Sequence, residues 1–123
     1  MSPKIRILIA DDHYILRVGL AIFLENFEDM VMVGEATNGQ QAVDLCQQLH
    51  PDVVLMDLAM PVMDGLTATE IITHTLPETR VIVLTSTFSD EKRQGALRAG
   101  AHTYLNKTVP VDTLANTIRE AAN

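Results

Sequence analysis

The chain has 123 residues, of which 47% are hydrophobic, so it is long enough to bury the core of one ordinary domain without disulfides or a structural metal. Its formal charge of −7 disfavours direct contact with nucleic acid or with an anionic membrane. The single Cys46 excludes an internal disulfide, and no apolar run is long enough to cross a bilayer. We therefore expect a soluble protein of the cytoplasm with no direct nucleic-acid or membrane partner.

Short apolar runs along the chain predict five strands. Continuous runs rich in β-branched residues are typical of strands that are buried on both faces of a parallel sheet. The run that contains Gly34 and Glu35 is weaker and suits an edge position. The predicted strands are residues 5–10, 31–36, 53–57, 80–85 and 103–107.

Each predicted strand is followed by apolar residues at helical spacing. The first helix is expected at residues 14–26, and the second begins after a turn or cap at Asn38-Gly39. The third is expected to run from a cap at Asp64 to about residue 76, and the fourth to cover residues 89–99. The residues expected on the inner faces of the first and last helices are Leu16, Leu20, Phe23, Leu24 and Phe27, then Leu114, Ile118 and Ala122, whereas Arg17 is expected in solvent. The 89–99 helix contains Gly95 and few large apolar residues, so it should be the least stable element.

Five alternating strand and helix units predict a doubly wound α/β fold, with a parallel sheet between two layers of helices. No internal repeat, low-complexity run or long linker divides the chain. We expect a single domain over residues 1–123.

Polar residues stand at the carboxyl ends of four predicted strands: Asp11 and Asp12, then Asp57, Thr85 and Lys107. Since these ends share one edge of a parallel sheet, the residues should form one site. Crowded carboxylates need a cation, and oxygen ligands at an open edge suit Mg²⁺. A hydroxyl, a lysine and Mg²⁺ around one aspartate predict an aspartyl-phosphate site, with Asp57 as the nucleophile.

These residues, together with several short motifs, resemble the receiver domain of two-component response regulators over nearly the whole chain. The motifs are Met60-Pro61, Asp64-Gly65, Thr85-Ser86, Ala99-Gly100-Ala101 and Tyr104-Leu105-x-Lys107. The resemblance implies a flavodoxin-like (βα)5 three-layer sandwich with strand order 2-1-3-4-5. The segments LIADDHYILRVGLAIFLE and VMVGEATNGQQAVDL are similar to the NarL/LuxR subgroup, whose members usually carry a DNA-binding domain after the receiver. We expect no output domain within residues 1–123, so DNA contact would need a separate C-terminal domain.

The resemblance also implies the roles of the site residues. Asp57 would accept phosphate from a histidine kinase. Asp11 and Asp12 would hold Mg²⁺ together with Asp57 and the backbone carbonyl of Ala59. Phosphorylation would change the surface of the protein and release no product. We therefore expect a phospho-accepting switch that can dephosphorylate itself rather than an enzyme.

The same resemblance implies a moving part and a partner. Thr85 would hydrogen-bond the phosphoryl group, Lys107 would pair with it, and Tyr104 would change its exposure. Regulators of this subgroup often form receiver homodimers, but the helical pattern does not say which helices pair.

Two positions depart from the family pattern. Lys107 is followed by Thr108 where the family often has proline in a cis bond, which leaves a cis or trans bond open. Ala59 has no polar side chain where many relatives have one, which leaves the lifetime of the phosphorylated state open.

Several alternatives stay open at this point. Asp11 could cap the first helix, Thr85 and Tyr104 could be ordinary structural residues, and His13 is interpreted as an exposed loop residue rather than a metal ligand. A haloacid dehalogenase-type phosphatase would need a D-x-D nucleophile where the chain has Asp11-Asp12-His13. A flavodoxin-like cofactor binder would need an anion-binding loop there. A receiver-like domain that acts by binding alone, without phosphorylation, is a further alternative.

Overall fold

The computed structural model describes residues 3–123, in which five strands alternate with five helices. The strands are β1 (Ile5–Ala10), β2 (Met30–Ala36), β3 (Val53–Asp57), β4 (Arg80–Thr85) and β5 (Thr103–Asn106). The helices are α1 (Tyr14–Glu25), α2 (Gly39–Leu49), α3 (Gly65–Thr75), α4 (Asp90–Arg98) and α5 (Val111–Ala122). Each predicted element is confirmed, with small shifts at its ends of the size that hydrogen-bond-based assignment usually shows.

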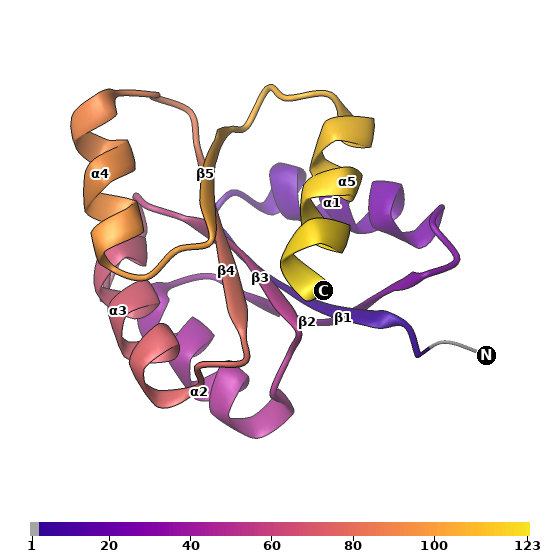
Figure 1. The fold of residues 1–123 in the computed structure, drawn as a ribbon, viewed down its shortest axis with the longest axis horizontal. Coiled ribbons are helices and arrows are strands. Elements are labelled where there is room, and N and C mark those ends of the chain that lie inside the picture. Colours follow the sequence, from indigo (N-terminus) through magenta and orange to yellow (C-terminus); the bar gives the residue numbers. More distant parts are fainter. Residues whose placement is uncertain (1–2) are drawn as a thin grey trace.

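The strands form one parallel sheet in the order β2-β1-β3-β4-β5, as the family resemblance implied. Helices α1 and α5 cover one face, and α2, α3 and α4 cover the other (Figure 1). Strand β2, which contains Gly34 and Glu35, lies at one edge, as its weak pattern predicted. The doubly wound three-layer fold is therefore confirmed.

The two faces of the sheet bury separate apolar clusters. Neighbouring residues of a strand point to opposite faces, so Ile7 packs in the cluster under α1 and α5, while Leu8 packs in the cluster under α2, α3 and α4. In β3 every residue from Val53 to Asp57 is buried. Burial on both faces explains why the central strands are continuous apolar runs rather than alternating ones.

Three helices begin with side-chain caps, and the sequence had indicated a cap for the first two of them. The side chains of Asn38, Asp64 and Ser89 accept hydrogen bonds from backbone N–H groups of the first turns of α2, α3 and α4. Helices α1 and α5 have no such side-chain cap, at His13 and Pro110 respectively. Both of these helices begin directly beside the polar edge of the sheet.

Three predicted side-chain positions are wrong. Phe23 is 47% exposed, because the inner face of α1 is centred on Leu24 rather than on Phe23. Arg17 is largely buried, since its guanidinium donates to the carbonyl of Asp11 at 2.8 Å and to Glu35.

The third wrong position is Ala122, which is exposed, while Ala121 is buried. At about 100° per residue, a position seven residues after Leu114 lies nearly on the same line of the helix, whereas an eighth residue is turned by roughly 80°.

None of the helices described between residues 3 and 123 has the length and apolar character required to span a membrane.

Candidate functional site

The carboxyl ends of β1, β3, β4 and β5 bring the predicted polar residues to one edge of the sheet. Past the strand ends, the Asp11 N–H donates to the Ala36 carbonyl at 3.0 Å, and the Lys107 N–H donates to the Thr85 carbonyl at 2.8 Å. These backbone bonds continue the strand pairing into the loops and so orient the side chains that follow. The bond between Lys107 and Thr108 is trans, since the described residues contain no cis peptide bond.

Lys107 lies between two buried carboxylates. Its Nζ is 2.8 Å from Asp11 Oδ2 and 3.3 Å from Asp57 Oδ1. Asp57 is only 5% exposed, and its second oxygen, Oδ2, is buried without a hydrogen-bond partner among residues 3–123. A buried carboxylate oxygen without a donor is costly, so this atom marks a place where a ligand would be favourable.

The pKa values of the two buried acids are shifted in opposite directions. Burial raises the pKa of Asp57, and the negative charge of Asp11 raises that pKa further, while Lys107 opposes both effects. Burial also acts to raise the pKa of Asp11, but hydrogen bonds from Lys107 and His13 outweigh burial and hold the Asp11 pKa below its usual value. Asp57 therefore carries the less stabilised negative charge in the absence of a further cation.

His13 is in contact with the acids. Its ring is exposed, as the sequence suggested, but Nδ1 is 2.8 Å from Asp11 Oδ1 and 3.3 Å from Asp12 Oδ1. The His13 N–H also donates to Asp11 Oδ1 at 2.9 Å, and no side chain caps α1. The interpretation of Asp11 as a helix cap is therefore wrong. One ligand atom from each of Asp11, Asp12, His13 and Asp57 lies within 4.8 Å of the others.

The predicted switch residues meet at the carbonyl of Thr87. The Thr85 hydroxyl donates to this carbonyl at 3.1 Å and accepts from the Thr87 N–H at 3.1 Å. The Tyr104 hydroxyl donates to the same carbonyl at 3.1 Å, and the Tyr104 ring is buried against Phe88, with 4.9 Å between ring centroids. Thr85 is thus held by its own loop in this structure. Sequence reasoning missed both Thr87 and Phe88. Thr87 takes part through its backbone carbonyl, which leaves no side-chain pattern, and Phe88 takes part through a tertiary contact with the Tyr104 ring.

Comparison with known proteins identifies the family. Residues 7–119 match the family model of the response regulator receiver domain. The chain belongs to the response regulator receiver family. This match favours the receiver interpretation over the phosphatase and cofactor-binding families that the sequence had left as alternatives.

Relatives of this receiver are named as a transcriptional regulatory protein and as response regulator proteins. It is 46% identical over 118 residues to the transcriptional regulatory protein LiaR of Bacillus subtilis, covering 96% of this chain and 56% of that protein. It is 37% identical over 118 residues to the response regulator protein VraR of Staphylococcus aureus, again covering 96% and 56%. The chain spans little more than half the length of these curated relatives.

Solved structures confirm the NarL/LuxR resemblance. The signal receiver domain of the putative response regulator NarL from Mycobacterium tuberculosis matches with a TM-score of 0.93 and 30% identity, over 98% of both chains. The response regulator domain of Thermotoga maritima CheB matches with a TM-score of 0.90 and 32% identity, over 98% of this chain and 97% of that one.

The loop between β3 and α3 of this receiver is packed tightly behind the acceptor. The Gly65 N–H donates to the Leu58 carbonyl, and the Gly39 N–H donates to the Met63 carbonyl, both at 2.9 Å. A methyl group on Gly65 would overlap the carbonyl oxygen of Asp57, and one on Gly39 would overlap the carbonyl oxygen of Met63. Two glycines therefore fix the loop that contains the exposed Ala59.

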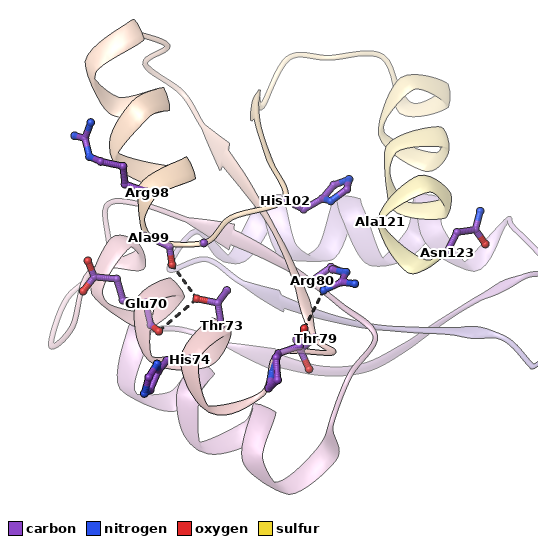
Figure 2. Close-up of a pocket in the computed structure, with 12 residues that line it drawn as sticks. Glu70, Thr73, His74, Thr79, Arg80, Arg98, Ala99, His102, Ala121 and Asn123 are labelled. Carbon is purple, nitrogen blue, oxygen red and sulfur yellow. Dashed lines mark hydrogen bonds between the residues drawn. The ribbon is translucent and has the colours of Figure 1, made fainter.

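A hollow of about 930 Å³ lies at the amino end of β4, and none of the acids at the carboxyl ends of the strands lines it (Figure 2). Its charged and imidazole side chains are Glu70, His74, Arg80, Arg98 and His102. Figure 2 shows Arg98 pointing away from Arg80 and His102, so these side chains do not converge on one point. The Thr73 hydroxyl between them donates to the Ala99 carbonyl at 2.8 Å. This hollow is chemically separate from the acidic edge.

Proposed function

We propose that Asp57 accepts a phosphoryl group from a histidine kinase in a Mg²⁺-dependent reaction, and that the acceptor's new charge changes the surface of the domain. The observation that supports this most directly is the unpartnered, buried Oδ2 of Asp57 beside Asp11 and Lys107. An oxygen in this position has its lone pairs free for a cation or for an electrophile.

The donor set fits a hard divalent cation. Asp11, Asp12 and Asp57 supply carboxylate oxygens close together, and Lys107 neutralises only part of their charge. Asp11, Asp12, Asp57 and the backbone carbonyl of Ala59 would hold the ion. When bound, Mg²⁺ would offset negative charge on the phosphoryl oxygens and lower the repulsion that Asp57 meets.

The transfer itself requires an in-line attack by Asp57. A carboxylate oxygen of Asp57 bonds to phosphorus while the phosphorus–nitrogen bond of the kinase phosphohistidine breaks, and the electron pair leaves with the imidazole nitrogen. Lys107 Nζ, already 3.3 Å from Asp57 Oδ1, is close enough to donate to a phosphoryl oxygen. No further protein base is needed, since Asp57 attacks as the ionised carboxylate.

The response would begin at Thr85. To reach the phosphoryl group, its hydroxyl has to leave Thr87, and the Thr87 carbonyl then keeps only the Tyr104 hydroxyl as a side-chain donor among the described contacts. The loop that contains Thr87 and Phe88 leads into α4, where Ala96 is the single buried residue. Few apolar contacts hold this helix, so a change at Thr87 can move it at low cost.

A decisive test is intact-mass spectrometry after incubation with acetyl phosphate, with and without Mg²⁺. We expect the wild type to gain one phosphate only with Mg²⁺ and Asp57→Asn to gain none. Asp44→Asn, which removes an exposed carboxylate on α2, should behave as the wild type. If a folded wild type binds Mg²⁺ and gains no phosphate, the chain is instead a receiver-like domain that acts by binding alone.

We also propose that the phosphorylated receiver pairs with a second copy through α1 and α5. A groove of about 330 Å³ between these helices is lined mainly by apolar side chains, among them Leu20, Phe23, Val109 and Leu114. Ile15, at its rim, is 79% exposed. Two chains that each carry a formal charge of −7 repel one another, and no acidic side chain among residues 3–123 lines this groove, so pairing through it adds no local repulsion. Lys107 lines this groove and also contacts Asp57, so a change at Asp57 can reach the groove through Lys107.

Sedimentation velocity with and without phosphorylation tests this pairing. Ile15→Glu should keep the phosphorylated protein monomeric, whereas Leu97→Glu on α4, on the other side of the sheet, should not. A phosphorylated Ile15→Glu protein that still dimerised would move the interface to another face.

The names of the relatives support a proposal for the output of the whole protein. LiaR is described as a transcriptional regulatory protein. We propose that residues 1–123 form a receiver that controls transcription in the cytoplasm through a DNA-binding domain outside this stretch.

A further inference from the structure

His13 places an imidazole nitrogen where a cation ligand would be expected. Its Nδ1 is 2.8 Å from Asp11 Oδ1 and 3.3 Å from Asp12 Oδ1. In an octahedral complex with bonds of 2.0–2.1 Å, adjacent ligand atoms lie about 2.9 Å apart. Both observed separations are close to that value, so Nδ1 and a carboxylate oxygen could occupy neighbouring positions around one ion with small movements.

A second observation points to the same place. Asp57 Oδ2 is buried and has no hydrogen-bond partner among the described residues, and the ligand atoms of Asp57, Asp11, Asp12 and His13 all lie within 4.8 Å of one another. The His13 ring is exposed on its other side. Without a metal, a proton on Nδ1 can donate to Asp11 Oδ1. When a metal binds, the ring proton would instead be held on Nε2 in contact with water, which leaves the Nδ1 lone pair for the metal.

We propose that His13 is a nitrogen ligand of the divalent-cation site and that it extends the site's preference from Mg²⁺ to first-row transition ions such as Mn²⁺. Mg²⁺ strongly prefers oxygen ligands, while imidazole suits later first-row transition ions such as Fe²⁺, Ni²⁺ and Zn²⁺. Mn²⁺ takes mainly oxygen ligands and binds at the weak end of this series, so a nitrogen ligand detected on Mn²⁺ would identify His13 under the least favourable conditions. This proposal rests on the proposed function, because it uses the same acids. It adds that transition ions can compete with Mg²⁺ for the site when they are available, and that the imidazole of His13 makes this competition possible.

The test is pulsed electron paramagnetic resonance of the Mn²⁺-loaded protein, combined with titrations of Mn²⁺ and Mg²⁺. A nitrogen ligand produces ¹⁴N modulation of the Mn²⁺ echo, which oxygen ligands do not. We expect this modulation in the wild type and its loss in His13→Ala. The same variant should bind Mn²⁺ about tenfold more weakly or worse, while its affinity for Mg²⁺ stays within roughly twofold.

His102→Ala is the matched control, because His102 is exposed and lies in the hollow away from the acids. It should keep both the modulation and the Mn²⁺ affinity. Bound Mn²⁺ without ¹⁴N modulation in the wild type, or with modulation retained in His13→Ala, would overturn the role of His13 and leave the phosphorylation proposal standing. Absence of any divalent-cation binding would instead overturn the metal site, and the His13 proposal with it.

Discussion

The two sides of the acceptor edge are built in different ways. On the β3 side, the backbone behind Asp57 is packed against Gly65, and the following loop is held at Met63 by Gly39. On the β4 and β5 side, helix α4 buries one residue, and hydrogen bonds to a single carbonyl, that of Thr87, connect the switch residues. A nucleophile needs a fixed position, whereas a response needs an element that can move at low cost. The structure gives the first property to one side and the second to the other.

The largest expected effect tests the fixed side. In Gly65→Ala the new methyl group would lie 2.8 Å from the carbonyl carbon of Asp57 and overlap its oxygen, so the backbone has to shift. We expect a loss of about 3 kcal/mol in the free energy of unfolding, measured by urea denaturation. Phosphate uptake from acetyl phosphate should fall as well. An unchanged stability would show that the loop behind Asp57 is more adaptable than its packing indicates.

The ionised side chain of Asp57 should destabilise the folded state in the absence of Mg²⁺. Asp57→Asn removes a buried charge with an unpartnered oxygen, so it should raise the free energy of unfolding by about 1–2 kcal/mol at neutral pH without Mg²⁺. Because the folded-state pKa of Asp57 is raised above 3.8, the folded wild type binds this proton more tightly than the unfolded chain. Wild-type stability should therefore decrease as pH rises from about 3.8 through the raised pKa, and Asp57→Asn should lack this decrease. Adding Mg²⁺ should stabilise the wild type more than the variant.

A smaller effect is expected on the movable side. Tyr104→Phe removes the hydroxyl that donates to the Thr87 carbonyl and leaves the ring packed against Phe88. We expect a loss of about 1 kcal/mol or less, together with faster hydrogen exchange from Thr87 into α4. Exchange in α2 should not change and serves as the internal control. Equal acceleration in both helices would contradict the division between the two sides.

The smallest effect should have the opposite sign. In Gly95→Ala the new methyl group on α4 meets open space, and alanine favours a helix more than glycine does. We expect a gain of about 0.5–1 kcal/mol by urea denaturation. A loss of stability would mean that α4 is packed more closely than its burial shows. The same chemical change is thus expected to destabilise at Gly65 and to stabilise at Gly95.

Hydrogen exchange of the phosphorylated domain compares the two sides directly. The face formed by α4, β5 and α5 should change its exchange, while α2 and α3 should not. A response confined to another face would contradict the assignment.

Much of this fold could be predicted, because the central strands are buried on both faces and leave continuous apolar runs, as at Val53–Asp57. The caps at Asn38 and Asp64, and the start of α4 at Ser89, could also be predicted, since a cap depends on one side chain and its local turn. The gathering of Asp11, Asp57 and Lys107 followed from strand ends in a parallel sheet. These features share a local or topological cause.

Other features depend on tertiary contacts that no local pattern records. The burial of Arg17 arises from the position of the Asp11 carbonyl and of Glu35 on β2. The contact of His13 with the acids depends on how the chain turns into α1. The roles of Ala59, Thr85 and Tyr104 during phosphorylation stay predictions, and only the resting contacts of the last two are described.

The close approach of Gly39 and Gly65 to backbone carbonyls also restricts how this sequence can vary. Any other residue at either position adds at least a methyl group where a carbonyl oxygen already lies. A library of single substitutions selected for a working receiver should therefore return almost only glycine at these two positions, although neither has a side chain that could touch a metal or a phosphate. Invariant glycines at such positions would result from the lack of space behind Asp57 and would not indicate that the glycines take part in phosphorylation.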